Sequence, residues 1–600
     1  MAGKEQEVQK TVAAKVGPMG LWKLILLLVT PLLFLPLPLL GNRSEASCAY
    51  VILLMTVYWM TEAVPLAVTA FLPIFLFPLL GVESAADTAK NYFKDTNFLI
   101  FGSLLMAVAV EVSGLQYRLA LRILLWFGAR PQWLILGFMI TAGFLSMWIS
   151  NTATCAMMMP IVIVVLEEIL RQKRRIATAH AQQMEAISVV DITNVDVIEV
   201  AVEGASVFDE RLSHEELGIC RATAIGVAFA SSVGGIGALT GASPNLILTG
   251  QLTQYYPKSN PITFANWFAF GMPMQILFMV VGWLWLLFLF MGWRSIMRCF
   301  AKRTQADQSI SKLLRREYEK LGHLRFDEGA IGIIFTIVII LWVLRDPGFI
   351  PGWGAWFKNE YVSDSTPVML ASFILFFFPS SLAPLLWWKR RCVRDVSPSD
   401  KSESAISQCT PGCTMPSYRP LMSWHYMQEK FPWAVIVLIG GGFALADGVK
   451  QSGLSTWLGC AMQSSLYSVK PAIVVLIFLC LMTVVSEFAS NSATASIFVP
   501  ILLTVAESLH VNPLYFGLSA AVGSSFGFML PVATPPNMIV FEKCKQLGIL
   551  GSSEMMKAGL GLDIISISIA FIVMHTAGMW VYHFDTYPAW AHSVANFSAC

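Results

Sequence analysis

Long apolar runs, separated by prolines and short polar segments, constrain this chain more than any other feature of its sequence. A helix that crosses a bilayer needs about 20 predominantly apolar residues, and a chain with many such runs cannot expose them all to water. Only 13% of the 600 residues are charged, whereas about 25% is usual for soluble domains. The sequence therefore predicts an all-α polytopic membrane protein.

We expect eleven transmembrane helices and two apolar stretches of a different kind. The two stretches, residues 131–170 and 471–510, are interrupted at their centres by the polar triplets SNT at 150–152 and SNS at 490–492. Each stretch could form two spans or one re-entrant hairpin. The eleven spans are predicted near residues 22–40, 48–64, 65–80, 97–113, 220–250, 264–293, 329–345, 366–388, 433–450, 513–542 and 559–583.

Basic residues in short loops indicate sidedness, because Lys and Arg in such loops stay in the cytoplasm. If both long stretches are re-entrant hairpins, all three basic loops are cytoplasmic. The N-terminus (1–21) is then cytoplasmic and the C-terminus (584–600) extracellular. We expect the protein in the plasma membrane, with the glycosylation sequon at Asn596 on the extracellular side. The basic loops are at residues 171–220, 294–325 and 389–394.

The chain contains an internal repeat, which is its most informative feature. SNTATCAMMMPI at 150–161 matches SNSATASIFVPI at 490–501, at an offset of 340 residues. SSVGGIGALTGASPNLIL at 231–248 matches GSSFGFMLPVATPPNMIV at 523–540, at an offset of 292. The difference between the offsets is close to the length of the cytoplasmic loop 171–220. The order of these matches predicts a duplicated unit.

The predicted topology makes the two halves inverted relative to each other. The span near residue 97 begins outside, whereas its counterpart near residue 433 begins inside. Inverted repeats with broken helices near the bilayer midplane are typical of secondary transporters. We therefore expect a transport site where the two repeats meet.

The duplicated motifs supply hard oxygen ligands, which suit sodium better than a soft metal. Ser, Thr and Gly also serve as helix-packing residues in membranes, but duplication of the whole pattern favours a site. Because the motifs contain no Arg or Lys, an anion would depend on helix N-termini, N–H groups, hydroxyls and co-bound cations. The side-chain candidates are Ser146, Ser150 and Asn151 in the first repeat and Ser486, Ser490 and Asn491 in the second.

At these motifs the chain resembles the divalent anion/sodium symporter family, and in particular its animal sodium-dicarboxylate cotransporters. The resemblance extends over residues 20–590 and includes TEAVPLAVTAFLPI at 61–74, RDPGFIPGW at 345–353 and GGGFALADG at 440–448. It implies an elevator-type transporter that forms a homodimer in the lipid bilayer. The function it implies is electrogenic, sodium-coupled import of succinate and related dicarboxylates, with citrate or sulfate cotransport as alternatives.

The resemblance also implies a division of the chain and a set of ligands. Scaffold helices are expected at 22–96 and 251–432, and the two repeats at 97–250 and 433–583. The implied sodium sites are Ser146, Ser150, Asn151 and the backbone of Gly241, and Ser486, Ser490, Asn491 and the backbone of Ala533. The implied substrate-binding residues are Asn151, Thr152, Ser243, Asn491, Ser492, Thr534 and Pro535.

Two features of the implied site depart from the family pattern. Ala242 stands where the family usually has Thr, and Ser243 stands where carboxylate carriers usually have Ala, Gly or Pro. A serine at this position also resembles the sulfate-transporting branch. The Pro-Asn pair that follows Ser243 resembles the carboxylate branch, so we expect a dicarboxylate as the substrate.

Other classes of function fit the sequence less well. Intramembrane acids such as Glu111 and Glu487 are functional candidates, but none forms a hydrolase motif, and no Walker A lysine is present. An enzyme is therefore not predicted. Glu487 adjoins Ser486 and is a candidate for tuning the second sodium site. The short basic clusters offer no extended face for nucleic acid, and saturable uphill uptake would distinguish a symporter from a channel.

Overall fold

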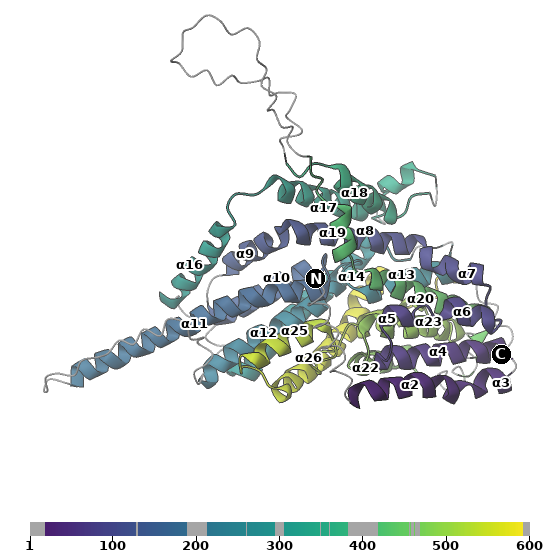
Figure 1. The fold of residues 1–600 in the computed structure, drawn as a ribbon, viewed down its shortest axis with the longest axis horizontal. Helices are drawn as coiled ribbons and strands as arrows, with labels where there is room; N and C mark the ends of the chain where they lie inside the picture. Colours follow the sequence, from purple (N-terminus) through teal and green to yellow (C-terminus); the bar gives the residue numbers. More distant parts are fainter. Residues whose placement is uncertain are drawn as a thin grey trace, which may run out of the picture.

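The computed structural model describes residues 18–591, apart from 42, 128–129, 189–212, 258, 260, 294–304, 348–349, 359–360, 382–417, 455–456, 458–460 and 462–468. These residues form helices joined by turns and irregular segments, and they contain no extended strand (Figure 1). Eight of the helices are long and apolar enough to cross a bilayer, and five apolar helices are shorter. The prediction of an all-α polytopic membrane protein is confirmed.

The first group of helices is shaped by proline, which lacks an N–H donor and is tolerated in the first turn of a helix. Pro36 and Pro73 lie in the first turns of α3 and α6, and Pro65 precedes α5, so the predicted spans at 22–40 and 65–80 are each divided. The helices are α2 (Pro18–Phe34), α3 (Pro36–Gly41), α4 (Ser44–Thr61), α5 (Leu66–Thr69), α6 (Leu72–Leu79) and α7 (Ala85–Lys90).

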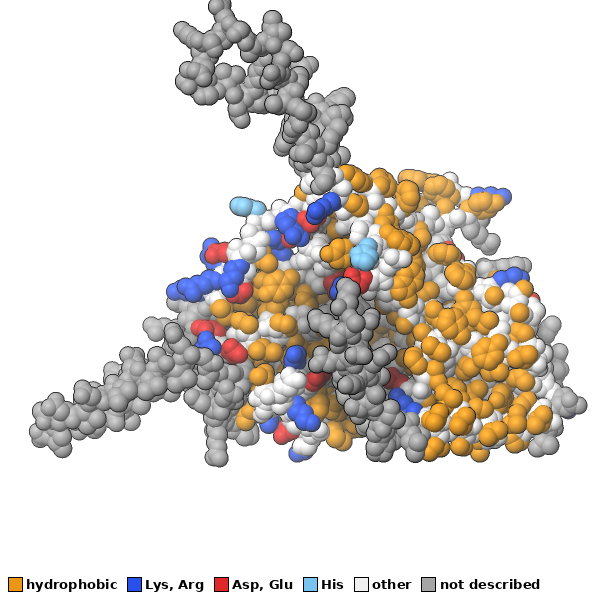
Figure 2. Space-filling model, in the orientation of Figure 1, with side chains coloured by type: hydrophobic (Ala, Val, Ile, Leu, Met, Phe, Trp, Pro, Cys, Tyr) orange, Lys and Arg blue, Asp and Glu red, His pale blue; other side chains and the backbone are white. Residues whose placement is uncertain are grey.

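These helices present an apolar surface. Leu24, Leu28 and Leu32 of α2 are each more than half exposed. On the face shown in Figure 2, hydrophobic side chains gather over this end of the molecule, whereas charged side chains gather at the end that carries α9 and α16. Such a surface is stable next to lipid, where exposed leucine costs nothing.

The two repeats fold into matching series of helices. The first contains α8 (Asp95–Ser113), α9 (Leu115–Phe127), α10 (Pro131–Ser146), α11 (Asn151–Ser188), α12 (His214–Gly234) and α13 (Ser243–Tyr255). The second contains α20 (Trp433–Gln451), α22 (Pro471–Ser486), α23 (Asn491–Ser508), α24 (Pro513–Gly523) and α25 (Pro535–Gln546). The predicted spans 220–250 and 513–542 are thus each two helices, because Gly- and Pro-containing segments interrupt them.

One predicted boundary was wrong. The hairpin was expected to end at residue 170 and to be followed by a loop, but α11 continues to Ser188 and projects beyond the other helices (Figure 1). Residues 171–186 are rich in Arg, Ala and Gln, which are strong helix formers. The basic residues thus did not indicate an irregular structure, and the side of the membrane that they indicate stays a prediction.

The remaining helices lie between and after the repeats. They are α14 (Phe264–Met291), α16 (Gln305–Lys320), α17 (Phe326–Arg345), α18 (Ser365–Phe377), α19 (Trp424–Lys430), α26 (Ser552–Val573) and α27 (Met579–Tyr582). A π-helical turn at Met574–Gly578 joins the last two. The predicted span 366–388 is helical only to Phe377, and its last residues lie outside the described part.

A buried arginine ties α9 to the start of α17. Arg118 is 7% exposed, and its Nε lies 2.9 Å from Oε2 of Glu328. Its other N–H groups donate to the carbonyls of Leu321, Gly322 and His323 at 3.1, 2.8 and 3.2 Å. A buried charge is tolerated only when it is paired and hydrogen bonded in this way. Helix α9, which the sequence did not predict, is thereby fixed in place.

Candidate functional site

Both polar triplets interrupt a helix, as predicted. Helix α10 ends at Ser146 and α11 begins at Asn151, while α22 ends at Ser486 and α23 begins at Asn491. The break is stabilised locally, since Ser150 and Ser490 accept the N–H groups of Ala153 and Ala493 at 3.3 and 3.2 Å. A side-chain oxygen at this position satisfies one of the free N–H groups at the start of a helix.

The two breaks have the same internal contacts. The Ser146 hydroxyl contacts Oδ1 of Asn151 at 2.7 Å and also the carbonyl of Ser231 on α12. The Ser486 hydroxyl contacts Oδ1 of Asn491 at 3.0 Å and the carbonyl of Ser524, which follows α24, at 2.7 Å. Both serines are fully buried. Each therefore brings together a hydroxyl, an amide oxygen and a carbonyl oxygen.

Each repeat also carries a loop between its two half-helices, which we call the first loop (residues 235–242) and the second loop (residues 527–534). The Asn245 amide donates to the carbonyls of Gly235 and Ala238 at 3.0 and 3.1 Å. The Asn537 amide donates to those of Gly527 and Leu530 at 2.9 and 3.1 Å. The contacts of these two asparagines are thus the same in both repeats.

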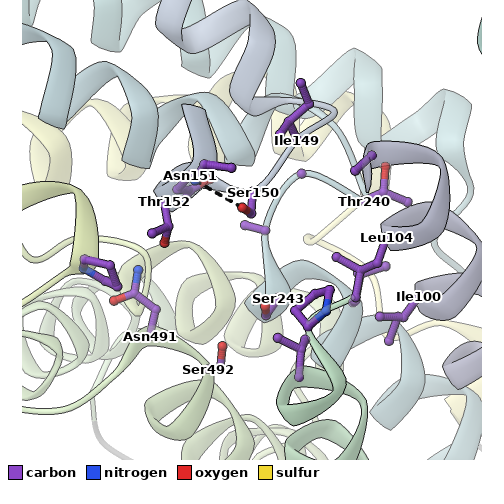
Figure 3. A pocket seen from close by; sticks show the side chains of 18 of the residues that line it. Ile100, Leu104, Ile149, Ser150, Asn151, Thr152, Thr240, Ser243, Asn491 and Ser492 are labelled. Atoms are coloured by element: carbon purple, nitrogen blue, oxygen red, sulfur yellow. Dashed lines mark hydrogen bonds between the residues drawn. The ribbon is translucent and has the colours of Figure 1, made fainter. Parts of the chain in front are cut away.

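The triplets and the loops surround one cavity of about 600 Å³ (Figure 3). All predicted ligand residues line it except Ser146 and Ser486, which are buried behind its wall. The predicted residues on the lining are Ser150, Asn151, Thr152, Gly241, Ser243, Ser490, Asn491, Ser492, Ala533, Thr534 and Pro535. The structure therefore brings the predicted set together, while their roles as ligands stay predictions. Asn596 lies outside the described residues.

Four helices begin at the wall of this cavity. Asn151, Ser243, Asn491 and Pro535 are the first residues of α11, α13, α23 and α25, and all four line the cavity. The start of a helix has unpaired N–H groups and the positive end of the helix dipole, which together favour an anion. The site can thus attract a carboxylate without a cationic side chain at its centre.

The other side of the cavity is formed by residues that the sequence did not single out. Ile100 and Leu104 of α8 and Val435 and Leu438 of α20 supply an apolar wall. Among the described lining residues, the charged ones are Glu111 and Lys430, and both are exposed. Glu111 was a candidate from the sequence as an intramembrane acid, but nothing in the sequence around Lys430 indicated that this residue lines the cavity.

The two loops differ at the residue that precedes the second half-helix. Thr534 caps α25, because its side chain accepts the N–H of Asn537 at 3.5 Å. Ala242 has almost the same backbone, with φ −135° and ψ 142° against φ −135° and ψ 150° for Thr534, but it has no side chain that can accept a hydrogen bond. The departure at Ala242 therefore leaves α13 without a side-chain cap.

Comparisons with known proteins agree with this geometry. The family model described as "Sodium:sulfate symporter transmembrane region" matches residues 19–584. The chain is 38% identical to mouse Na(+)/dicarboxylate cotransporter 3, covering 96% of this chain and 95% of the relative. It is 39% identical to rat Na(+)/citrate cotransporter, covering 95% and 96%, and 34% identical to rat solute carrier family 13 member 1, covering 96% and 98%.

These relatives are cotransporters or solute carriers, so the chain is a transport protein and not an enzyme. The family predicted from the SNT and SNS motifs, the two loops and the three further segments is confirmed over nearly the whole chain. This protein belongs to the sodium:sulfate symporter family, the divalent anion/sodium symporters.

Proposed function

We propose that this protein is a sodium-coupled symporter that imports four-carbon dicarboxylates such as succinate across the plasma membrane. The observation that carries the proposal is the cavity at which four helices begin and two Ser/Asn triplets meet. Two polar tips on one cavity suit a ligand with two carboxylates, because each tip can bind one of them. The named relatives include a dicarboxylate and a citrate cotransporter.

The proposal assigns sodium to the oxygen clusters behind the triplets. Ser146, Ser150, Asn151 and the Gly241 carbonyl would hold one ion, and Ser486, Ser490, Asn491 and the Ala533 carbonyl the other. Two buried serines with amide and carbonyl oxygens beside them support this assignment. Bound sodium would add positive charge next to the substrate carboxylates and make anion binding depend on the cation.

Citrate and sulfate are the alternative substrates. Ser243 adds a hydroxyl to the cavity wall beside the first loop, and we expect it to disfavour a bulky third carboxylate. Sulfate is more compact than succinate and would contact both triplets only if the cavity closed further. The proposal also includes a homodimer and an elevator-type movement of the two repeats, with the N-terminus in the cytoplasm; these rest on membership of the family.

The central experiment measures uptake of radiolabelled succinate by cells that express this chain, with sodium or choline outside. We expect saturable, sodium-dependent, concentrative uptake. We also expect an inward current, which requires at least one sodium ion beyond the two assigned sites, because two sodium ions only balance the charge of a succinate dianion; one net charge moved through 100 mV supplies about 2.3 kcal/mol. Unlabelled succinate, 2-oxoglutarate, citrate and sulfate are then compared as competitors. Strong inhibition by sulfate with little by 2-oxoglutarate would replace the dicarboxylate proposal with sulfate cotransport.

Variants link this activity to the site. Ser150→Ala and Asn491→Ala should reach the cell surface but require more sodium for half-maximal uptake or lose uptake altogether. Thr253→Ala, which removes an exposed hydroxyl from α13, is the matched control and should behave like the wild type. Unchanged sodium dependence in both site variants would show that the sodium sites lie elsewhere.

A further inference from the structure

Two carboxyl groups that the proposed ligand set does not include lie against the second loop. Glu487 follows α22 directly, and Asp563 lies in the middle of α26. They are 4% and 5% exposed, and each accepts a backbone N–H group of the second loop. Buried acids in a membrane protein are costly to retain, which makes two acids on one loop a candidate for function.

Together the two carboxyl groups accept the backbone N–H groups of three consecutive residues. Glu487 accepts the N–H groups of Met529 and Leu530 at 2.9 and 2.8 Å, one on each oxygen. Asp563 accepts the N–H of Phe528 at 3.3 Å. Hydrogen bonds from N–H groups to a carboxylate are stronger than those between neutral groups. Three consecutive peptide units of the second loop are therefore fixed by two side chains.

Helix α26 is shaped to make this contact. One turn before Asp563, Gly559 lies so close to the loop that a Cβ atom there would be 2.0 Å from the Phe528 carbonyl oxygen and 2.4 Å from Cα of Met529. Any side chain at Gly559 would therefore push the helix away from the loop. Residues four apart lie on one face of a helix, so Gly559 and Asp563 form a single contact surface.

The held segment leads directly to the predicted sodium ligand. The Leu530 N–H bonds to Glu487, and its carbonyl accepts the N–H of Ala533 at 3.2 Å and the amide of Asn537 at 3.1 Å. The Ala533 carbonyl is the backbone ligand assigned to the second sodium ion. At the other end, Glu487 adjoins Ser486, whose hydroxyl belongs to the same ligand set. Glu487 therefore links the break after α22 to the second loop.

The first loop has neutral side chains at the corresponding places. Met147 occupies the position of Glu487, and it is buried. Gly271 and Gln275 on α14 correspond to Gly559 and Asp563 on α26, since a Cβ atom at Gly271 would be 2.6 Å from the Ile236 carbonyl oxygen. Gln275 donates to the Gly143 carbonyl at 3.0 Å. The acidic pair is therefore a property of the second loop.

We propose that Glu487 and Asp563 are positioning residues that hold the second loop in the arrangement that binds the second sodium ion. Neither residue needs to touch sodium or substrate. The inference rests on the proposed function, because it concerns the same site. It adds a residue from α26 to a site that the motifs assign to the hairpin and the loop alone.

The test measures, for surface-expressed variants, the sodium concentration that gives half-maximal succinate uptake and the succinate KM at saturating sodium. Glu487→Ala should raise the sodium requirement roughly tenfold, as loss of a residue that supports metal ligands typically does. The KM at saturating sodium should stay near the wild-type value. Asp563→Ala should have a smaller effect in the same direction, because it removes one N–H acceptor and not two.

Conservative variants separate positioning from general destabilisation. Asp563→Asn keeps an oxygen that can accept the Phe528 N–H, so it should restore most of the sodium affinity that Asp563→Ala loses. Glu487→Gln keeps one acceptor but turns an NH2 group toward the other N–H, so it should remain impaired. Glu507→Gln is the control, because Glu507 is a buried acid at the far end of α23 that accepts a hydrogen bond from Tyr256. It should leave the sodium requirement unchanged.

If a variant does not reach the surface, the sodium-dependent rise in thermal stability of the purified protein gives the same answer without transport. Wild-type sodium dependence in Glu487→Ala, or equal impairment in Asp563→Asn and Asp563→Ala, would overturn the inference. Ser490→Ala separates failure of the positioning role from failure of the proposed sodium site. If Ser490→Ala and Glu487→Ala both leave the sodium requirement unchanged, the proposed sodium site is wrong. If Ser490→Ala raises the sodium requirement and Glu487→Ala does not, only the positioning role is wrong.

Discussion

The first and second loops follow a similar backbone course, but the side chains that hold them differ in hydrogen-bonding role: donors at the first loop and acceptors at the second. At the first loop a neutral side chain donates, since Trp267 Nε1 bonds to the Ile236 carbonyl at 3.0 Å. Beside this loop, Gln275 donates to the Gly143 carbonyl of α10. Around the second loop, Glu487 and Asp563 accept backbone N–H groups. The asparagines that follow the loops, Asn245 and Asn537, are alike in both.

This difference shows that duplication preserved geometry while the supporting side chains diverged. Two oxygen clusters of the same shape then lie in different electrostatic surroundings, because only the second has two carboxyl groups in its supporting shell. A nearby negative charge favours a cation. We therefore expect the two proposed sodium sites to differ in affinity, although their first ligands are matched residue for residue.

The largest effect is expected where the loops agree. Asn245→Ala and Asn537→Ala each remove two buried hydrogen bonds to loop carbonyls, and each lost bond costs about 1 kcal/mol or more when its partner stays unsatisfied. Surface-normalised succinate uptake should therefore fall by at least about tenfold in both variants. Uptake is measured beside Thr253→Ala as the control. A large loss in one variant with normal uptake in the other would break the correspondence between the loops.

The next effect tests whether the contact between α14 and α10, beside the first loop, requires a neutral donor. Gln275→Glu replaces the NH2 group that bonds to the Gly143 carbonyl with a carboxylate oxygen, so two acceptors face each other. The expected cost is about 1–3 kcal/mol, seen as a higher sodium requirement for uptake and a lower apparent Tm. Gln275→Met, which removes the donor without adding charge, is the companion variant and should be less impaired. Equal transport by Gln275→Glu and the wild type would contradict the comparison.

A smaller effect concerns the helix caps. Ala242→Thr places a hydroxyl where Thr534 caps α25, on a backbone of nearly the same conformation. A new cap should stabilise the protein by about 1 kcal/mol, and Thr534→Ala should cost about the same. Thermal unfolding of the purified protein measures both as shifts of opposite sign in apparent Tm. A fall in Tm for Ala242→Thr would mean that the first loop needs the smaller residue.

The smallest effect concerns an acid away from both loops. Glu83 accepts hydrogen bonds from Gln451 and Thr88 at 3.0 Å each. Burial, and then the Asp447 carboxyl beside it, raises the pKa of Glu83 from 4.5 to about 7. Because the pKa is raised on folding, this group favours the folded state most below pH 4.5 and loses that contribution as pH rises through 7.

Thermal stability of the wild type should therefore decline between pH 5 and pH 8 by more than that of Glu83→Gln, since a glutamine does not titrate over this roughly neutral range. Uptake by Glu83→Gln should keep its sodium dependence, because Glu83 contacts neither loop. Parallel pH profiles for the two proteins would show that Glu83 does not titrate in this way.

The sequence repeat predicted the helix breaks and the loops that line the cavity. The matches at 150–161 and 490–501 located both helix breaks, and the loop matches located both sets of carbonyls that Asn245 and Asn537 bind. These features depend on residues close together in the sequence, where Ser, Asn, Gly and Pro act on their own backbone. Local chemistry of this kind is readable without a structure.

Contacts across long separations were not predictable in the same way. Glu487 was a candidate because it adjoins Ser486. The contact of Asp563 with the same loop depends on how α26 packs, and Asp563 lies in an ordinary apolar helix. In the sequence, α14 corresponds to α26 only at a glycine (Gly271 and Gly559) and at one polar residue (Gln275 and Asp563). Two positions in more than twenty are too few to stand out among apolar helices, so the repeat was not seen to extend this far.

The Arg118 contacts also constrain the order in which the chain can be assembled. All the partners that neutralise or bond this guanidinium lie between residues 321 and 328, more than 200 positions later in the chain. A ribosome adds about 5–20 residues per second, so Arg118 waits roughly 10–40 seconds for them. During that time α9 has to remain where water or lipid headgroups solvate its charge. The helix can reach its buried position only after α17 has begun to emerge, so this junction forms after the whole first repeat has been synthesised.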